Sequence, residues 1–444
     1  LSNVLFNSMR GGVFPHGHRI RVDDLERFVG SRNTVVADAH REWFARLDDW
    51  CEVVDLREAA LAVGDPDLGR LVLEYLPLTF SRRHGDPSRP WNRFAINVRD
   101  DDGAELLAYE GNWRDIFQNW EALLHSYPAF FPNVVAKFVN ASTIDGHNPY
   151  RISQRGIDWE VPDPDDPWSH IGYWGDHQII YLLRLLETWE RYEPGALVGW
   201  LERPLFVYAN VPYTIASHDA MVSDARNTIS YDEDEADLIA AREGALGADG
   251  RLVLDDAGAV VHVGMLEKLL VSALAKLSSF VPGGGIWINT QRPEWNDANN
   301  ALAGPGLSMV TLYHLRRYLG FVASLLDRAD TDRVELSESV AAWLADVTTV
   351  LQDVPPESAA TDERQRRTVV DALGRSGEAH RARITSGSGF AVHDVAVSEV
   401  RLFCAAASEQ LDRTIRAGRR SDGLYHSYNR VSFPDQDTAR VDHL

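Results

Sequence analysis

The feature that most constrains the fold is a series of long amphipathic segments after about residue 110. In seven segments, apolar residues recur at helical spacing, and long polar and aromatic loops separate the segments. Residues three and four positions apart share one face of a helix, so each segment predicts a helix that buries one side. A mainly α fold is expected. The predicted helices cover residues 115–127, 175–192, 264–281, 306–328, 335–352, 361–374 and 393–418.

The beginning of the chain has a different, mixed pattern. A helical pattern runs through residues 34–50, whereas residues 70–75 and 93–98 resemble short strands. We therefore divide the chain into a mixed strand and helix segment, residues 1–110, and a helical domain, residues 111–444.

The composition argues against two kinds of partner. Asp and Glu number 66 against 44 Lys and Arg, and this formal charge of -22 repels nucleic acid and anionic membrane surfaces. The longest apolar runs, such as residues 271–281, are shorter than the roughly 20 residues of a membrane span. The two cysteines are far apart, and no secretory leader pattern is present. We expect a cytoplasmic protein, and we expect this chain to be part of a longer one.

Three polar and aromatic motifs lie at or before the starts of predicted helices. The first is Gly111 to Trp120, in which Arg114 and Gln118 are four apart and share one helical stripe, with Asp115 beside it. Such a stripe faces either a pocket or the solvent, and these residues alone leave both open. Trp113, in the same motif, is a candidate for an aromatic wall.

The second motif is Trp174 to Gln178, which follows the polar segment Tyr150 to Gly156. Asp176 occupies the position of a helix N-cap ahead of an apolar ladder, so it is a cap, a ligand or both. His177 is able to bond a sugar hydroxyl, although a core histidine satisfied by the backbone is equally common. This motif therefore supplies two further candidate ligands.

The third motif is the short segment from Glu294 to Asn300, which contains Trp295, Asn296 and Asp297. Sugars present apolar C–H faces that stack on aromatic rings, and hydroxyls that need amides or carboxylates. An acid beside an indole and several amides is therefore suited to hold a sugar and to protonate its glycosidic oxygen. The alternative is a capped turn, in which Asn296 or Asp297 accepts backbone N–H groups.

In order and spacing, the three motifs resemble the cellobiose and chitobiose phosphorylases over about residues 105–330. The resemblance implies an (α/α) six-hairpin toroid, incomplete in this chain, and an inverting reaction. It also implies that Asp297 is the general acid and that Arg114 and Asp115 bind the sugar whose anomeric carbon is attacked. The departures from the family pattern are Asn119, Ala298 and Asn299.

We therefore predict a carbohydrate-active enzyme that cleaves or forms a glycosidic bond, favouring phosphorolysis of a β-linked gluco-oligosaccharide. Phosphate would then be a cosubstrate and one acid would suffice, whereas an inverting hydrolase needs a second carboxylate to activate water. Neither version requires a metal or an organic cofactor. The predicted proton donor is Asp297. The predicted substrate-binding residues are Trp113, Arg114, Asp115, Gln118, Asp176, His177, Glu294, Trp295 and Asn296.

Two other classes of protein stay open at this point. Residues 163–166 have the D-x-D-D form of terpene cyclases, but they lie in a Pro-rich acidic loop whose aromatic neighbours come with polar partners. A non-catalytic glycan-binding or scaffolding α/α domain would keep the same aromatic and amide residues. An enzyme would lose turnover and retain sugar affinity in the Asp297→Asn variant, whereas a binding domain would tolerate the change.

Overall fold

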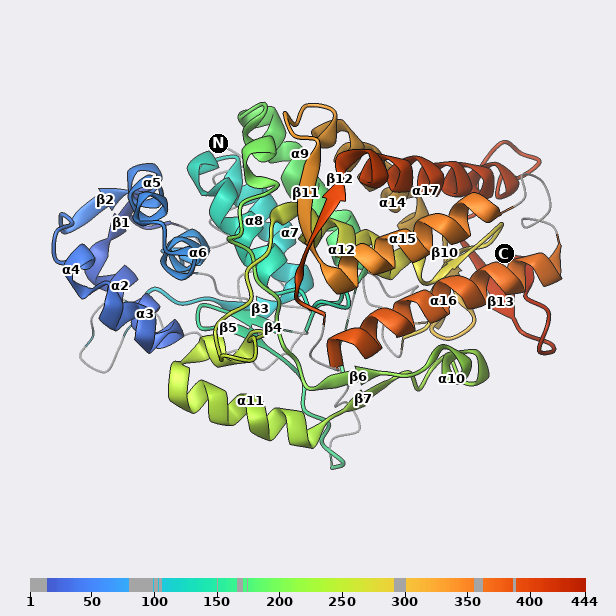
Figure 1. Ribbon diagram of the computed structural model, residues 1–444, viewed down its shortest axis with the longest axis horizontal. Helices are drawn as coiled ribbons and strands as arrows, with labels where there is room; N and C mark the ends of the chain where they lie inside the picture. Colours follow the sequence, from blue (N-terminus) through green and yellow to red (C-terminus); the bar gives the residue numbers. More distant parts are fainter. Residues whose placement is uncertain are drawn as a thin grey trace.

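The computed structural model shows an elongated molecule with short helices at one end and long helices at the other (Figure 1). It describes residues 14–79, 99, 103, 106–149, 151–165, 171–173, 175–290, 301–354, 362–385 and 389–444, apart from the side chains of Asn112, Arg114 and Asp115. Helices dominate these residues, and a small sheet accompanies them near the beginning. The expected mainly α fold with a mixed first segment is therefore confirmed.

Residues 14–79 form a small N-terminal unit of helices beside a two-stranded antiparallel sheet. The expected helix over residues 34–50 is wrong in part, because the chain turns at His40 and enters a strand at Trp50. Its elements are β1 (Arg19–Arg21), α2 (Val22–Arg32), α3 (Thr34–Ala39), α4 (Arg41–Phe44), β2 (Trp50–Glu52), α5 (Val53–Val63) and α6 (Pro66–Glu74).

Helix α6 corrects the strand that was expected at residues 70–75. The Asp65 side chain accepts hydrogen bonds from the N–H groups of Asp67 and Leu68, and Pro66 occupies the first turn. Both features favour the start of a helix. The last seven residues of α6 are all buried, the polar side chains of Arg70 and Glu74 among them. The second expected strand, residues 93–98, lies outside the described residues.

The remaining helices make up the body of the protein. All seven expected helices are present, and α16 extends beyond the predicted end to Thr385. The body helices are α7 (Trp113–Leu124), η2 (Pro128–Phe130), α8 (Phe131–Asn140), η3 (Gln178–Leu182), α9 (Leu183–Tyr192), η4 (Ala196–Trp200), α10 (His218–Ser223), α11 (Glu233–Leu246), η5 (Ala248–Arg251), α12 (Met265–Leu277), α14 (Met309–Leu326), α15 (Glu338–Asp353), α16 (Glu363–Thr385) and α17 (Val397–Ala417).

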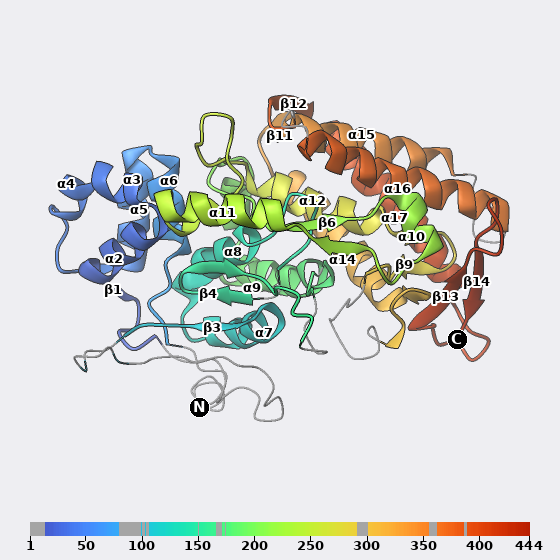
Figure 2. The ribbon, with the colours of Figure 1, turned by 90° about the horizontal axis from the view of Figure 1, so that it is seen from below.

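Short antiparallel sheets connect the helices of the body. The largest has the strand order β14-β13-β10-β9-β8, and it joins the segments that follow α12 and α17. Figures 1 and 2 show α11 and the β6–β7 ribbon along one side of the body. The strands are β3 (Glu110–Asn112), β4 (Arg151–Ser153), β5 (Gly156–Asp158), β6 (Tyr213–Ile215), β7 (Ile229–Tyr231), β8 (Phe280–Val281), β9 (Gly285–Trp287), β10 (Gly306–Ser308), β11 (Arg333–Ser337), β12 (Val392–Ala396), β13 (Tyr428–Ser432) and β14 (Arg440–His443).

Neighbouring body helices pack in pairs around one apolar core. Helix α14 packs against α17, α15 against α16, and α12 contacts both α14 and α15. The largest apolar cluster includes residues from Phe14 to Leu411, so it crosses the boundary that we predicted at residue 110. The described helices supply such pairs without defining a closed ring of six hairpins, and the toroid stays a prediction.

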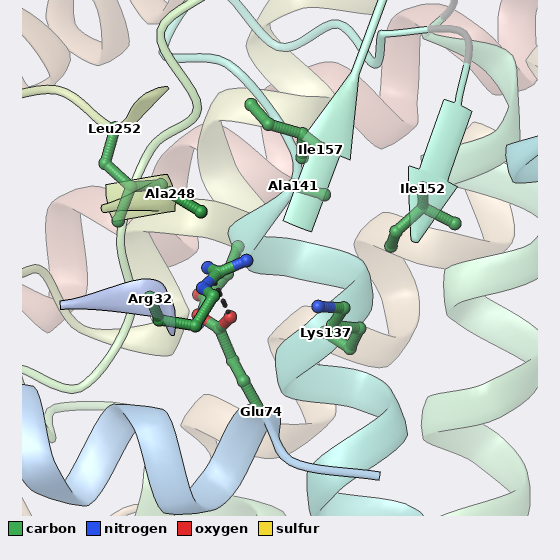
Figure 3. Close-up of a pocket in the computed structure, with 9 residues that line it drawn as sticks. Arg32, Glu74, Lys137, Ala141, Ile152, Ile157, Ala248 and Leu252 are labelled. Atoms are coloured by element: carbon green, nitrogen blue, oxygen red, sulfur yellow. Dashed lines mark hydrogen bonds and ion pairs between the residues drawn. The ribbon is translucent and has the colours of Figure 1, made fainter. Parts of the chain in front are cut away.

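A buried ionic cluster joins the N-terminal unit to the body (Figure 3). Arg32 lies 3.0 Å from Glu74 and 3.4 Å from Asp249, and Arg70 pairs with the same two carboxylates. Burial alone would raise the pKa of Glu74, but the charges of Arg32 and Arg70 lower it to about 2. Lys137 faces the small cavity that Arg32 and Glu74 line, and its amine has no hydrogen-bond partner among the described residues. Burial and the charge of Arg32 lower the pKa of Lys137 to about 7.

Candidate functional site

The first two sequence motifs meet where α7 passes the start of η3. Nε2 of Gln118 donates a hydrogen bond of 2.6 Å to the Tyr181 hydroxyl. The Tyr181 ring in turn lies 5.4 Å from the ring of His177, measured between centroids. Burial and the charge of Lys276 lower the pKa of His177 to about 3, so this imidazole is neutral near pH 7. The structure thus brings together one residue of the first motif and one of the second.

Asp176 adjoins the C-terminal end of α12. Helical backbone begins at Asp176, and Oδ1 of its carboxylate accepts a 3.1 Å hydrogen bond from Nζ of Lys276 in the last turn of α12. The side chains of Asp176 and Lys276 are only 8% and 12% exposed, so water screens this ion pair weakly. The second motif therefore lies against the turn that leads toward the third.

The loop after α8 supplies a polar network that the sequence analysis did not identify. Asp145 accepts hydrogen bonds from the hydroxyls of Thr143 and Tyr173, and the Tyr173 ring stacks on His147 with centroids 4.7 Å apart. Burial alone would raise the pKa of Asp145, but hydrogen bonds from His147, Thr143 and Tyr173 lower it well below its usual range. Asp145 is therefore a fixed, ionised carboxylate.

This loop forms one wall of a pocket at the end of α12. The pocket volume is about 530 Å³ when the open solvent at its mouth is included. Carboxylate, guanidinium, imidazole, hydroxyl and amide groups share its wall with apolar side chains, a composition that suits a ligand with both hydroxyls and C–H faces. The polar lining residues are Asp145, His147, His218, Ser278, Ser279, Asn289, Thr290 and Arg381.

The third motif follows directly from the wall of this pocket. The strands on its two sides are tied together, because the N–H of Ile288 bonds the carbonyl of Gly306 at 2.9 Å, and the N–H of Gly304 bonds the carbonyl of Ile288 at 2.8 Å. Asn289 and Thr290 continue from this stem and line the pocket. Glu294, Trp295, Asn296 and Asp297 themselves lie outside the described residues. Thr290, the last described residue before Asp297, therefore lies in the wall of the pocket.

The second edge of the same sheet comes from the last part of the chain. Ser308 of β10 pairs with Tyr428 of β13, and the N–H of Met309 bonds the carbonyl of Ser427 at 3.0 Å. The segment after α17 is thus fixed beside the start of α14, at the same end of the body as the pocket.

The other predicted site residues are placed as follows. Trp113 is 0% exposed and its ring packs on Phe117 and Phe138 in the core, and its expected role as a stacking or pocket-wall residue stays a prediction. Arg114 and Asp115 lie in the first turn of α7, and their side chains are outside the description.

Sequence reasoning missed the pocket residues Asp145 and Arg381. The signal that was available for Asp145 was its place before a glycine in a loop too long to be a simple connection. Arg381 lies within α16, where its spacing is that of any helical arginine. Only the packing of distant segments reveals that it lines a pocket.

Comparison with known families gives one match. Residues 14–77 match the description "Glycoside hydrolase family 149 insertion domain 1", and this range corresponds to the N-terminal unit. The match supports a carbohydrate-active enzyme of the glycoside hydrolase or phosphorylase type, and the cellobiose phosphorylase-like placement of residues 105–330 stays a prediction. No curated protein matches the chain.

Membrane spans and metal centres are two other kinds of site that the described residues could contain. Within those residues, no helix is both long enough and apolar enough to cross a membrane. In the same part of the chain, no three His, Cys, Asp or Glu side chains are grouped so that they could hold a metal ion.

Proposed function

We propose that this chain belongs to a glycoside hydrolase family 149 enzyme that cleaves or forms a glycosidic bond with inversion. The favoured reaction is phosphorolysis of a β-linked gluco-oligosaccharide in the cytoplasm, with inorganic phosphate as cosubstrate and no other cofactor. One observation carries the proposal. The pocket that Asn289 and Thr290 line adjoins the segment of Asp176, so the chain regions of the second and third motifs flank one polar pocket.

In this proposal Asp297 protonates the glycosidic oxygen as the bond to the anomeric carbon breaks. Protonation makes the departing sugar a better leaving group, and phosphate attacks from the opposite face of the ring. A single acid is sufficient because phosphate is already a nucleophile. Glu294, Trp295 and Asn296 would contact the sugar from the same segment.

The remaining predicted ligands would bind the hydroxyls of the sugar. Arg114 and Asp115 stay candidates from the first motif, together with Gln118. Asp176 and His177 would contribute a carboxylate and a neutral imidazole, which bond hydroxyls well. Asp145 joins this set as a new candidate, because its ionised carboxylate lines the pocket.

Product analysis tests the proposal. The chain is incubated with a panel of β-linked glucose disaccharides and oligosaccharides, with and without inorganic phosphate, and the products are separated by anion-exchange chromatography. Sugar 1-phosphate that forms only with phosphate supports phosphorolysis, and free sugar in both buffers supports the hydrolase instead. The Asp297→Asn variant should lose at least a hundredfold in turnover and keep its affinity for the sugar. Full activity in that variant would refute the assignment of Asp297.

The alternative is a non-catalytic glycan-binding domain. It predicts that isothermal titration detects oligosaccharide binding, that neither buffer yields product, and that Asp297→Asn changes neither result.

A further inference from the structure

Lysine is rare in this chain and occurs only in its interior. Three of the 44 basic residues are lysines, and the others are arginines. Lys137 and Lys268 are 2% and 1% exposed, and the Lys276 side chain is 12% exposed. Arginine ends in a wide planar guanidinium, whereas lysine ends in a compact amine on a flexible stem. The three lysines therefore occupy confined positions, and one of them, Lys276, adjoins the pocket.

Lys276 lies in the last turn of α12, between the pocket residues Ala275 and Ser278. Its anionic partner among the described residues is Asp176, whose Oδ1 is 3.1 Å from Nζ. Both side chains are nearly buried, and the attraction between charges increases as water is removed. The ammonium therefore holds the Asp176 carboxylate against the end of α12.

Two glycines make this close approach possible. A Cβ atom at Gly175 would lie 2.6 Å from Cε and 2.8 Å from Nζ of Lys276. A Cβ atom at Gly146 would lie 2.4 Å from Cβ of Ala275, and the carbonyl of Gly146 lies close to Gly175 as well. Non-bonded carbons prefer separations of about 3.5–4.0 Å. The end of the Lys276 side chain thus passes close to the backbone at Gly175, where the wider guanidinium of an arginine would meet that backbone.

We infer that Lys276 is a positioning residue that fixes the Asp176 carboxylate at the end of α12, next to the pocket wall that contains Asp145, so that the two carboxylates bind hydroxyls of an uncharged sugar. The ligand in this inference rests on the proposed function, whereas the positioning rests on the contacts of Lys276. Asp176 is neutralised by its partner and the adjacent His177 is uncharged, so this side of the site suits hydroxyls better than an anionic group.

The test compares Lys276→Met and Lys276→Arg with Lys268→Met as the matched control. Lys268 lies on the same helix, is more deeply buried than Lys276, and donates a hydrogen bond to the carbonyl of Ser142 instead. We expect Lys276→Met to raise KM for the oligosaccharide about tenfold and to leave kcat within about threefold, as the loss of a ground-state binding contact does. Lys276→Arg should not restore KM, because the guanidinium is wider than the amine and would meet the backbone at Gly175. Wild-type KM in Lys276→Met, or an equal rise in folded Lys268→Met, would overturn the inference.

A readout without turnover separates this inference from the proposed function. If the wild-type chain forms no product, the proposed reaction fails, and ¹³C NMR of aspartate-labelled protein then decides the positioning role. The Asp176 carboxylate resonance is identified by its absence in Asp176→Asn. It should move in Lys276→Met and keep its position in Lys268→Met. An unchanged resonance in Lys276→Met would overturn the positioning role whatever the activity.

Discussion

The amine of Lys137, which has no hydrogen-bond partner among the described residues, leads to a quantitative prediction about stability and pH. Four charged groups face it from three parts of the chain: Arg32 on α2, Arg70 and Glu74 on α6, and Asp249 on η5. The two arginines and the two carboxylates balance one another without Lys137. A proton on the Lys137 amine therefore adds one uncompensated charge to the interior. We predict that Lys137→Met removes a pH-dependent loss of stability.

The size of the effect follows from the pKa of Lys137, which changes from about 7 in the folded protein to the ordinary lysine value of 10.5 when the chain unfolds. Between these values the unfolded amine holds a proton that the folded amine has released. The free energy of unfolding therefore rises with pH by about 1.4 kcal/mol per unit, or about 5 kcal/mol over the whole interval. Stability is lost as the pH falls from 10.5 toward 7, and below 7 this residue causes little further loss.

Urea unfolding at pH 9 and pH 7.5, followed by tryptophan fluorescence, measures the effect. The free-energy difference between Lys137→Met and the wild type should shift by about 2 kcal/mol in favour of the variant at the lower pH. Tyr109→Phe is the matched control, because Tyr109 is buried in the same region and both its folded and unfolded states stay protonated at these two pH values. A parallel pH dependence in Lys137→Met and the wild type would refute the reasoning.

Three further predictions concern named contacts. Asp249→Asn removes one of the two buried carboxylates that balance Arg32 and Arg70, so that Glu74 alone of this pair remains, and should reduce the free energy of unfolding by about 3–5 kcal/mol; a loss below about 1 kcal/mol in urea titration would contradict it. Gly146→Ala forces a side chain onto a residue with φ of +83° that has no space for it, so calorimetry should show a loss of about 1–3 kcal/mol. Unchanged melting would show that the loop adjusts freely. Tyr173→Phe removes the hydroxyl that donates a hydrogen bond to Asp145, and a loss of about 1–2 kcal/mol in the free energy of unfolding is expected in the same assay. A stability equal to that of the wild type would rule out this role.

The helices of the body were predictable where each buries one face. In α14, for example, Leu312, Leu315 and Leu319 are buried at helical spacing, whereas Arg317 and Ser324 are exposed. Helices at the two extremes of burial were missed. All ten residues of α8 are buried. In α11 only Ile239 is buried, and this helix shows no amphipathic period.

The candidate site was predictable only in its local parts. Asp176 and His177 were predicted because they precede an apolar ladder, a signal contained in neighbouring residues. Asp145, Lys276 and Arg381 gain their meaning from three segments that come together only in the folded chain. The burial of Trp113 is a similar case, because an aromatic residue in a polar motif does not reveal which way the helix turns its ring.

The ionic cluster at the joint has a consequence for how the N-terminal unit was acquired. Arg32, Arg70 and Glu74 belong to the unit, whereas Lys137 and Asp249 belong to the body. A body without the unit would keep the Lys137 amine and the Asp249 carboxylate without the charged groups of the unit that now surround them. Gain or loss of the unit in evolution should therefore coincide with substitutions at both body positions. We expect relatives that lack the unit to carry uncharged residues there.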